Sequence, residues 1–140
     1  MHVNQPKNPS VNDFVFSGVQ SKKATIELFN NVNLTLSVMS NFPALDGIGI
    51  SMVRAEVGVK GSYPMHTHYV AADFLIMVVA ELTDGWRCIV FPKGHMHFLV
   101  NFGARIAVAF SSFSTVNTGG FQFADKLSFV TQNTALLDFE

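Results

Sequence analysis

Short apolar or alternating stretches, separated by Gly, Pro, Asn and Asp, constrain the fold of this chain more than any other sequence feature. In residues 33–39, three aliphatic side chains alternate with Thr35 and Ser37, which is the period-two pattern of a strand with one buried face. Similar strand-like stretches are 14–16, 47–59, 74–79, 88–91, 97–102 and 105–112. Residues 20–30 suit a helical turn, and no long amphipathic helix is present.

Many short strands at close spacing predict an all-β fold with little helix, arranged as an antiparallel sandwich or barrel. Residues 74–79 are apolar at every position, which predicts a strand buried on both faces. In residues 47–59, Arg54 and Glu56 mark an outer face. The 140 residues contain no repeat or low-complexity tract, so we expect one domain, 1–140, whose residues 1–12 form a polar arm.

Charged side chains are scarce. Nine Lys and Arg against ten Asp and Glu give a net charge of −1, and charged residues make up 14% of the chain, against about 25% in typical domains. We therefore expect no binding to nucleic acid or to a membrane surface, and no apolar run approaches the ~20 residues of a membrane-spanning helix. So few charges predict that part of the apolar surface is buried against a ligand or a second subunit.

The single cysteine, Cys88, excludes an internal disulfide bond. Its apolar neighbours predict a small buried side chain. Residues 1–13 contain no apolar segment of the kind that a signal peptide needs, which is compatible with a cytoplasmic location.

Histidines and one carboxylate form the main candidate site. His66 and His68 are two residues apart on a predicted strand, so their side chains share one face about 7 Å apart and can reach one ion. Asp73 follows five residues later, and His97 comes near the next strand. Three imidazoles and a carboxylate suit Mn, Fe or Zn. The alternative is a pair of ordinary surface or core histidines.

The sequence around these positions resembles that of plant germin-like proteins. Residues 61–73, GSYPMHTHYVAAD, are similar to the family's first motif, in which a glycine precedes His-x-His and a glutamate. Residues 91–101, FPKGHMHFLVN, are similar to the second motif, Pro-x-Gly-x-x-His-x-x-x-Asn. Residues 12–18, 42–51 and 107–114 also resemble segments of the family, so the resemblance covers nearly the whole chain.

This resemblance implies a cupin, that is, a jelly-roll β-barrel with its metal site inside. By motif position, His66, His68 and His97 are the implied metal-binding and catalytic histidines, and Asp73 stands where the family has its metal-binding glutamate. The resemblance further implies manganese, an oligomer built on dimers and an extracellular, apoplastic location. Superoxide dismutation and oxalate oxidation occur in the family, although many members have neither activity.

The chain departs from the germin pattern in several places. Asp73 is shorter than glutamate by ~1.3 Å, whereas metal–ligand distances tolerate only about 0.2 Å. Either the strand shifts, a water molecule bridges, or the carboxylate does not ligate. We favour the last alternative, a weak three-histidine site with low or absent manganese occupancy. Compared with the family, the link from Asp73 to Pro92 is short by about two strands of ~5–6 residues, which opens one barrel wall or forces new strand pairing. The family's N-terminal disulfide segment and C-terminal helices are not recognised, which favours a dimer over a hexamer.

Two functions of different classes remain open. The first is a manganese-dependent oxidoreductase acting on a small molecule, with superoxide favoured over oxalate, at an open coordination position. The second is a metal-poor cupin that binds, isomerises, cyclises or eliminates an apolar small molecule, with histidine as acid or base. A receptor or storage protein without catalysis is a further alternative. Metal content distinguishes the first class from the others.

The remaining expectations concern single side chains. His95 alternates with His97 and is a rival ligand, although we expect it on the surface. Trp86 and Tyr63 are placed at the barrel mouth, and Asn101 is interpreted as a structural hydrogen-bonding residue. The methionines expected to line the barrel are Met52, Met65, Met77 and Met96.

Overall fold

The computed structural model describes residues 8–20, 26–28, 31–79 and 87–117. Within these ranges there are eight β-strands and three 3-10 helices of three or four residues. The strands are β1 (Ile26–Leu28), β2 (Val32–Ser37), β3 (Ser51–Val57), β4 (Ser62–His66), β5 (Asp73–Val79), β6 (Arg87–Phe91), β7 (His97–Val100) and β8 (Ala107–Phe113). The helices are η1 (Val11–Phe14), η2 (Ser17–Gln20) and η3 (Pro43–Leu45).

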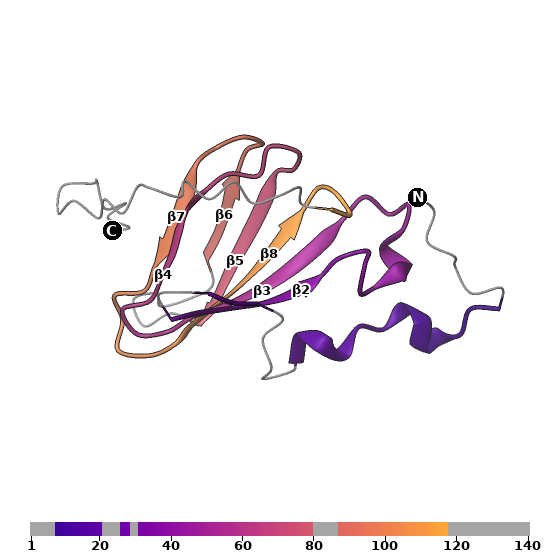
Figure 1. The fold of residues 1–140 in the computed structure, drawn as a ribbon, viewed down its shortest axis with the longest axis horizontal. Coiled ribbons are helices and arrows are strands. Elements are labelled where there is room, and N and C mark those ends of the chain that lie inside the picture. Colours follow the sequence, from indigo (N-terminus) through magenta and orange to yellow (C-terminus); the bar gives the residue numbers. More distant parts are fainter. Residues whose placement is uncertain (1–7, 21–25, 29–30, 80–86, 118–140) are drawn as a thin grey trace.

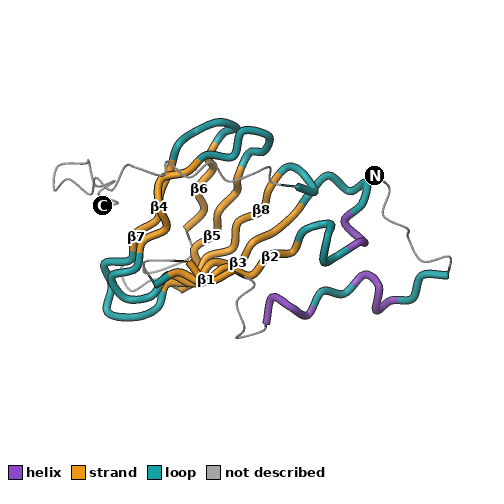
Figure 2. Tube along the Cα trace, viewed as in Figure 1, coloured by secondary structure: helices purple, strands orange, loops and turns teal. Residues whose placement is uncertain are grey.

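The strands form two antiparallel sheets (Figures 1 and 2). The larger sheet has the order β1-β2-β3-β8-β5-β6, and the smaller sheet pairs β4 with β7. All strand pairs are antiparallel. The predicted all-β fold with little helix is therefore confirmed. None of the described helices is long and apolar enough to cross a membrane.

The core lies between the two sheets. Along β3, every second side chain from Ser51 to Val57 is buried, whereas Arg54 and Glu56 lie on the outer side as predicted. Tyr63 of β4 and Leu99 of β7 cover this inner face from the smaller sheet. The buried core cluster consists of Val32, Leu34, Val53, Ala55, Val57, Tyr63, Ala71, Ala107 and Phe113. Alternation along each strand thus directs one face of the larger sheet toward the interior.

The six strand predictions from residue 33 onward each overlap an observed strand, but two predictions nearer the N-terminus were wrong. Phe14 ends helix η1, because Ser10 and Asp13 form a capping box that closes a turn there. Residues 26–28, where we expected a helical turn, form β1 instead. The strand β1 pairs with β2, and Asn31 adopts the positive φ of +62° in the intervening turn.

Two predictions of burial were also wrong. Strand β5 buries one face only: Leu75 is 1% exposed, whereas Phe74 is 41% exposed. Cys88 is exposed, because it lies opposite Ile76 on the outer side of the sheet, while Ile89 lies opposite the buried Leu75. In both strands the two-residue period of the backbone outweighs the uniformly apolar sequence.

Strands β5 and β6, on either side of the link that the sequence predicted to be short, are neighbours in the larger sheet. The two strands pair with each other, from Asp73 opposite Phe91 to Met77 opposite Arg87, and the residues that join them, 80–86, lie outside the described ranges. Among the described residues, the smaller sheet has two strands against six in the larger one.

Candidate metal centre

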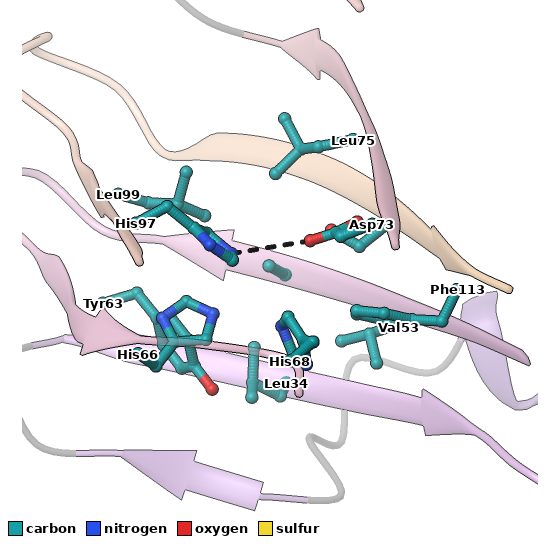
Figure 3. A pocket seen from close by; sticks show the side chains of 12 residues that line it. Leu34, Val53, Tyr63, His66, His68, Asp73, Leu75, His97, Leu99 and Phe113 are labelled. Carbon is teal, nitrogen blue, oxygen red and sulfur yellow. Dashed lines mark ion pairs between the residues drawn. The ribbon is translucent and has the colours of Figure 1, made fainter. Parts of the chain in front are cut away.

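The four predicted site residues come together at the ends of three strands (Figure 3). His66 is the last residue of β4 and lies opposite His97, the first residue of β7. His68 lies two residues beyond β4, and Asp73 begins β5. The pairing of β4 with β7 therefore supplies two of the imidazoles, the connection between β4 and β5 supplies the third, and the start of β5 supplies the carboxylate.

The three imidazoles form one compact group. One ligand nitrogen from each of His66, His68 and His97 lies within 4.8 Å of the others. The three side chains are buried, with exposed fractions of 3–7%. His68 was predicted to share a strand face with His66, but the strand ends at His66. The backbone oxygen of His68 instead accepts a 3.0 Å hydrogen bond from the Gly94 amide, which anchors the loop that carries it.

Backbone carbonyls fix the orientation of two rings. Nδ1 of His66 lies 2.9 Å from the Pro64 carbonyl oxygen, and Nδ1 of His97 lies 3.1 Å from the oxygen of His95. A carbonyl oxygen can only accept, so each Nδ1 is the donor, which leaves Nε2 as the nitrogen with which the neutral ring can bind a metal. This arrangement is the usual support for histidines that bind a metal through Nε2.

Burial favours the neutral imidazoles. Desolvation lowers the pKa of His66 from 6.5 to about 3, and the nearby His97 and His68 contribute in the same direction. Burial also lowers the pKa of His68, partly opposed by Asp73. A metal binds only the unprotonated ring. Both side chains are therefore in the metal-binding form at neutral pH without having to release a proton.

Asp73 lies beside this group but is not part of it. Its Oδ2 atom is 3.7 Å from Nε2 of His97, and its side chain is 3% exposed. Its Oδ1 atom is buried and accepts no hydrogen bond from the described residues. A buried carboxylate with an unsatisfied oxygen is costly unless positive charge is near it. A donor set of three imidazoles and one carboxyl group therefore fits a divalent cation.

A small cavity of about 30 Å³ adjoins these side chains, which is room for roughly one or two water molecules. Its lining is mostly apolar, with Ser111 of β8 as the one hydroxyl besides that of Tyr63. The lining residues are Leu34, Val53, Ala55, Tyr63, His66, His68, Asp73, Leu75, His97, Leu99, Ser111 and Phe113.

Several expectations about the barrel interior were wrong. Tyr63, placed at the mouth, is 4% exposed and lines the cavity. None of the four methionines lines it, and Met96 is 59% exposed on the loop between β6 and β7. Sequence reasoning also missed Ser111 and Phe113, although their two-residue spacing on β8 was a usable signal. Trp86 lies outside the described residues.

The expectations for the two polar residues near the second motif are confirmed. His95 is exposed on the loop before β7. The buried amide of Asn101 donates to the carbonyl oxygens of Val57, Gly58 and Arg105, at 2.7–3.1 Å. Its Oδ1 atom accepts from the Gly103 amide at 2.9 Å. Asn101 therefore ties the end of β7 to the turn after β3.

Comparison with known proteins gives consistent matches in sequence. A protein-family model described as Cupin matches residues 85–137. The auxin-binding protein ABP19b of Prunus persica is 35% identical over 130 residues, which cover 82% of this chain and 62% of the relative. Germin-like protein subfamily 3 member 1 of Arabidopsis thaliana is 32% identical over 130 residues, with the same coverage of both chains. The chain thus spans about three-fifths of the length of these relatives.

Solved structures share the fold. Peruvianin-I, a cysteine peptidase from Thevetia peruviana latex, aligns with a TM-score of 0.69 at 21% identity, over 86% of this chain and 82% of its own. Oxalate oxidase in complex with the substrate analogue glycolate aligns with a TM-score of 0.63 at 22% identity, over 80% and 64%. At this level of identity the likeness extends to the fold alone.

Proposed function

We propose that this chain is a germin-like cupin, that it binds a divalent metal ion, manganese, through His66, His68 and His97, and that it acts as a metal-dependent oxidoreductase on superoxide. The observation that carries the proposal is the convergence of three buried imidazoles whose ligand nitrogens lie within 4.8 Å of one another. Asp73 supplies negative charge beside them. The chain spans about three-fifths of the length of these relatives.

The residues of this chain would prepare the site in three ways. The backbone carbonyls of Pro64 and His95 orient the rings of His66 and His97. Burial keeps His66 and His68 unprotonated, as their lowered pKa values indicate. The apolar lining limits water near the centre, which strengthens electrostatic interactions there. A bound manganese ion would supply one-electron redox chemistry and an open coordination position for the substrate.

Cavity size favours a very small substrate. The volume of about 30 Å³ suits a diatomic species such as superoxide, whereas pockets for ordinary small-molecule ligands have about 300–1,000 Å³. None of the twelve lining residues is Lys or Arg, so no fixed cation besides the metal would hold the second carboxylate of oxalate. These two observations support superoxide over oxalate.

A second candidate function is the binding or conversion of an apolar small molecule. It is favoured by the apolar lining of the cavity and by relatives named as auxin-binding proteins. An aromatic carboxylic acid would have to displace Leu34, Leu99 or Tyr63, because the cavity volume of about 30 Å³ is too small to hold an aromatic ring. A receptor or storage protein without catalysis would also need these side chains to move before such a ligand could enter the cavity.

We also propose a homodimer and, by family resemblance, an apoplastic location. The outer apolar face is defined here as Phe74, Ile76, Cys88, Val90 and Phe110, which lie side by side on β5, β6 and β8. Phe74 is 41% and Val90 61% exposed, and the face carries no charged side chain. A contiguous uncharged apolar face supports burial against a second copy.

Superoxide consumption by the purified chain tests the proposed reaction. We expect activity from protein reconstituted with Mn²⁺, loss of activity after chelation, and loss in the His68→Ala variant. The His95→Ala variant serves as the matched control, because His95 is exposed and outside the three-histidine group. Saturable binding of an aromatic carboxylic acid to a metal-free protein without dismutase activity would favour the second candidate instead.

A further inference from the structure

Each imidazole of the candidate metal centre is packed against one aromatic ring. Tyr63 meets His66 edge-on, with ring centroids 4.4 Å apart and an interplanar angle of 86°. Phe113 lies 4.6 Å from His68 at 57°. Phe91 is stacked on His97 at 4.0 Å and 8°, the shortest and most parallel of the three contacts. The three aromatic residues come from β4, β8 and β6, so different parts of the fold support different imidazoles.

Phe91 contacts His97 and is also the strand partner of Asp73. It lies directly opposite Asp73 in the ladder between β5 and β6, and Asp73 lies opposite Phe113 in the ladder between β5 and β8. These three side chains therefore lie side by side on the larger sheet. His97 comes from the smaller sheet and reaches across to Phe91, so this stacked pair links the two sheets at the site.

The stack supplies a constraint that hydrogen bonding alone does not. The 3.1 Å contact between Nδ1 of His97 and the His95 oxygen fixes the direction of one ring nitrogen, but the ring can still rotate about that hydrogen bond. A parallel aromatic ring at 4.0 Å fixes the plane of the imidazole. Together the two contacts determine where Nε2 points.

We propose that Phe91 is a positioning residue that holds the imidazole of His97 in the plane in which Nε2 faces the other two imidazoles, before any metal arrives. The assignment of Nε2 as a metal ligand rests on the proposed function, whereas the orientation of the metal-free ring does not. Supporting partners of metal-binding histidines typically change metal affinity by about 10–100-fold when they are replaced, and we expect a change of that size here.

The first test is made on the metal-free protein. The ring protons of His97, assigned by their loss in the His97→Ala variant, should show the ring-current shift of a stacked phenyl group. We expect that shift to disappear in Phe91→Leu, which keeps an apolar side chain but no ring, and to persist in Phe91→Tyr. Phe74→Leu is the matched control, because Phe74 is on the adjacent strand with its ring on the outer face.

The second test is a titration with Co²⁺, followed by its visible spectrum. We expect Phe91→Leu to bind Co²⁺ about tenfold or more weakly and with an altered spectrum, and Phe91→Tyr and Phe74→Leu to match the wild type. Unchanged affinity and spectrum in a folded Phe91→Leu variant would overturn the proposal. So would a Phe91→Tyr variant as impaired as Phe91→Leu, because a planar ring would then not be what matters.

The two tests separate this proposal from the proposed function. If wild-type protein binds no Co²⁺ but its His97 signals lose their ring-current shift in Phe91→Leu alone, the metal assignment fails and the positioning of His97 by Phe91 stands. If the shift is absent from the wild type, the positioning role itself is refuted. Should Phe91→Leu not fold, the wild-type signals and the Phe91→Tyr variant still decide the matter.

Discussion

Replacing Asp73 by glutamate tests how the carboxylate relates to the three histidines. Two ligands bound side by side at about 2.1 Å from one octahedral metal ion lie ~3.0 Å apart, and in a tetrahedral site ~3.4 Å apart. Oδ2 of Asp73 and Nε2 of His97 are 3.7 Å apart, so the carboxylate falls short by about 0.3–0.7 Å. That shortfall exceeds the ±0.2 Å tolerance of a metal–ligand bond, and one added methylene group is long enough to close it.

We therefore expect Asp73→Glu to bind Mn²⁺ at least tenfold more tightly than the wild type, which corresponds to about 1.4 kcal/mol. The opposing term is the insertion of a methylene group into a packed interior, which costs about 1–3 kcal/mol where no space exists. Here the cavity of about 30 Å³ beside Asp73 reduces that cost. The assay is a Mn²⁺ titration of both proteins, with dissociation constants measured by calorimetry.

Asp73→Asn is the control for charge, because it keeps the size of the side chain and removes its negative charge. It should weaken Mn²⁺ binding if Asp73 acts on the ion through space. Tighter binding by the wild type than by Asp73→Glu would refute this reasoning, because it would mean that the aspartate already ligates and that the longer side chain disturbs the site.

Three further predictions follow from burial and hydrogen bonding. The pKa of His66 falls from 6.5 to about 3 on folding, so between these pH values the unfolded chain binds more protons than the folded one. The unfolding free energy should therefore fall as the pH drops from 6.5 toward 3, by up to ~1.4 kcal/mol per pH unit. Urea titrations at pH 7 and pH 5 should show a smaller loss of unfolding free energy in His66→Gln than in the wild type. Asn101→Ala should destabilise the fold by about 2–4 kcal/mol in the same assay at pH 7, since it leaves buried carbonyl groups without donors, and a loss below 0.5 kcal/mol would contradict the role assigned to Asn101. Val90→Asp places a charge on the outer apolar face and should convert a dimer into a monomer in light scattering, whereas a wild-type monomer would show that no dimer exists.

Sequence periodicity predicted most of the strands because each has one buried face. Leu34 and Val53 alternate with outward side chains, and this alternation is visible in the sequence. It failed in β5 and β6, where Phe74 and Cys88 are apolar yet lie on the outer side. Apolar side chains on both faces remove the period-two signal, so the sequence does not show which face is buried.

The sequence predicted the site residues that belong to the two motifs, but not the side chains that pack around them. The spacing of His66, His68 and His97 identified the three imidazoles that the structure brings together. The positions of Tyr63 and Phe91 beside them were not predicted, because these contacts depend on how the smaller sheet packs on the larger one. The separation of Asp73 from His97 likewise depends on how the two sheets pack, although the short side chain of Asp73 indicated in advance that the carboxylate would not reach a metal ion.

The metal content of the purified protein tests the central claim most directly. At equilibrium with saturating Mn²⁺, measured by equilibrium dialysis, we expect close to one bound manganese per chain in the wild type and in His95→Ala, and none above background in His97→Ala. We also expect no manganese above background in His66→Ala and in His68→Ala. Manganese retained at the wild-type level in a folded His97→Ala variant, or absent from the wild type at saturating Mn²⁺, would contradict the three-histidine metal site.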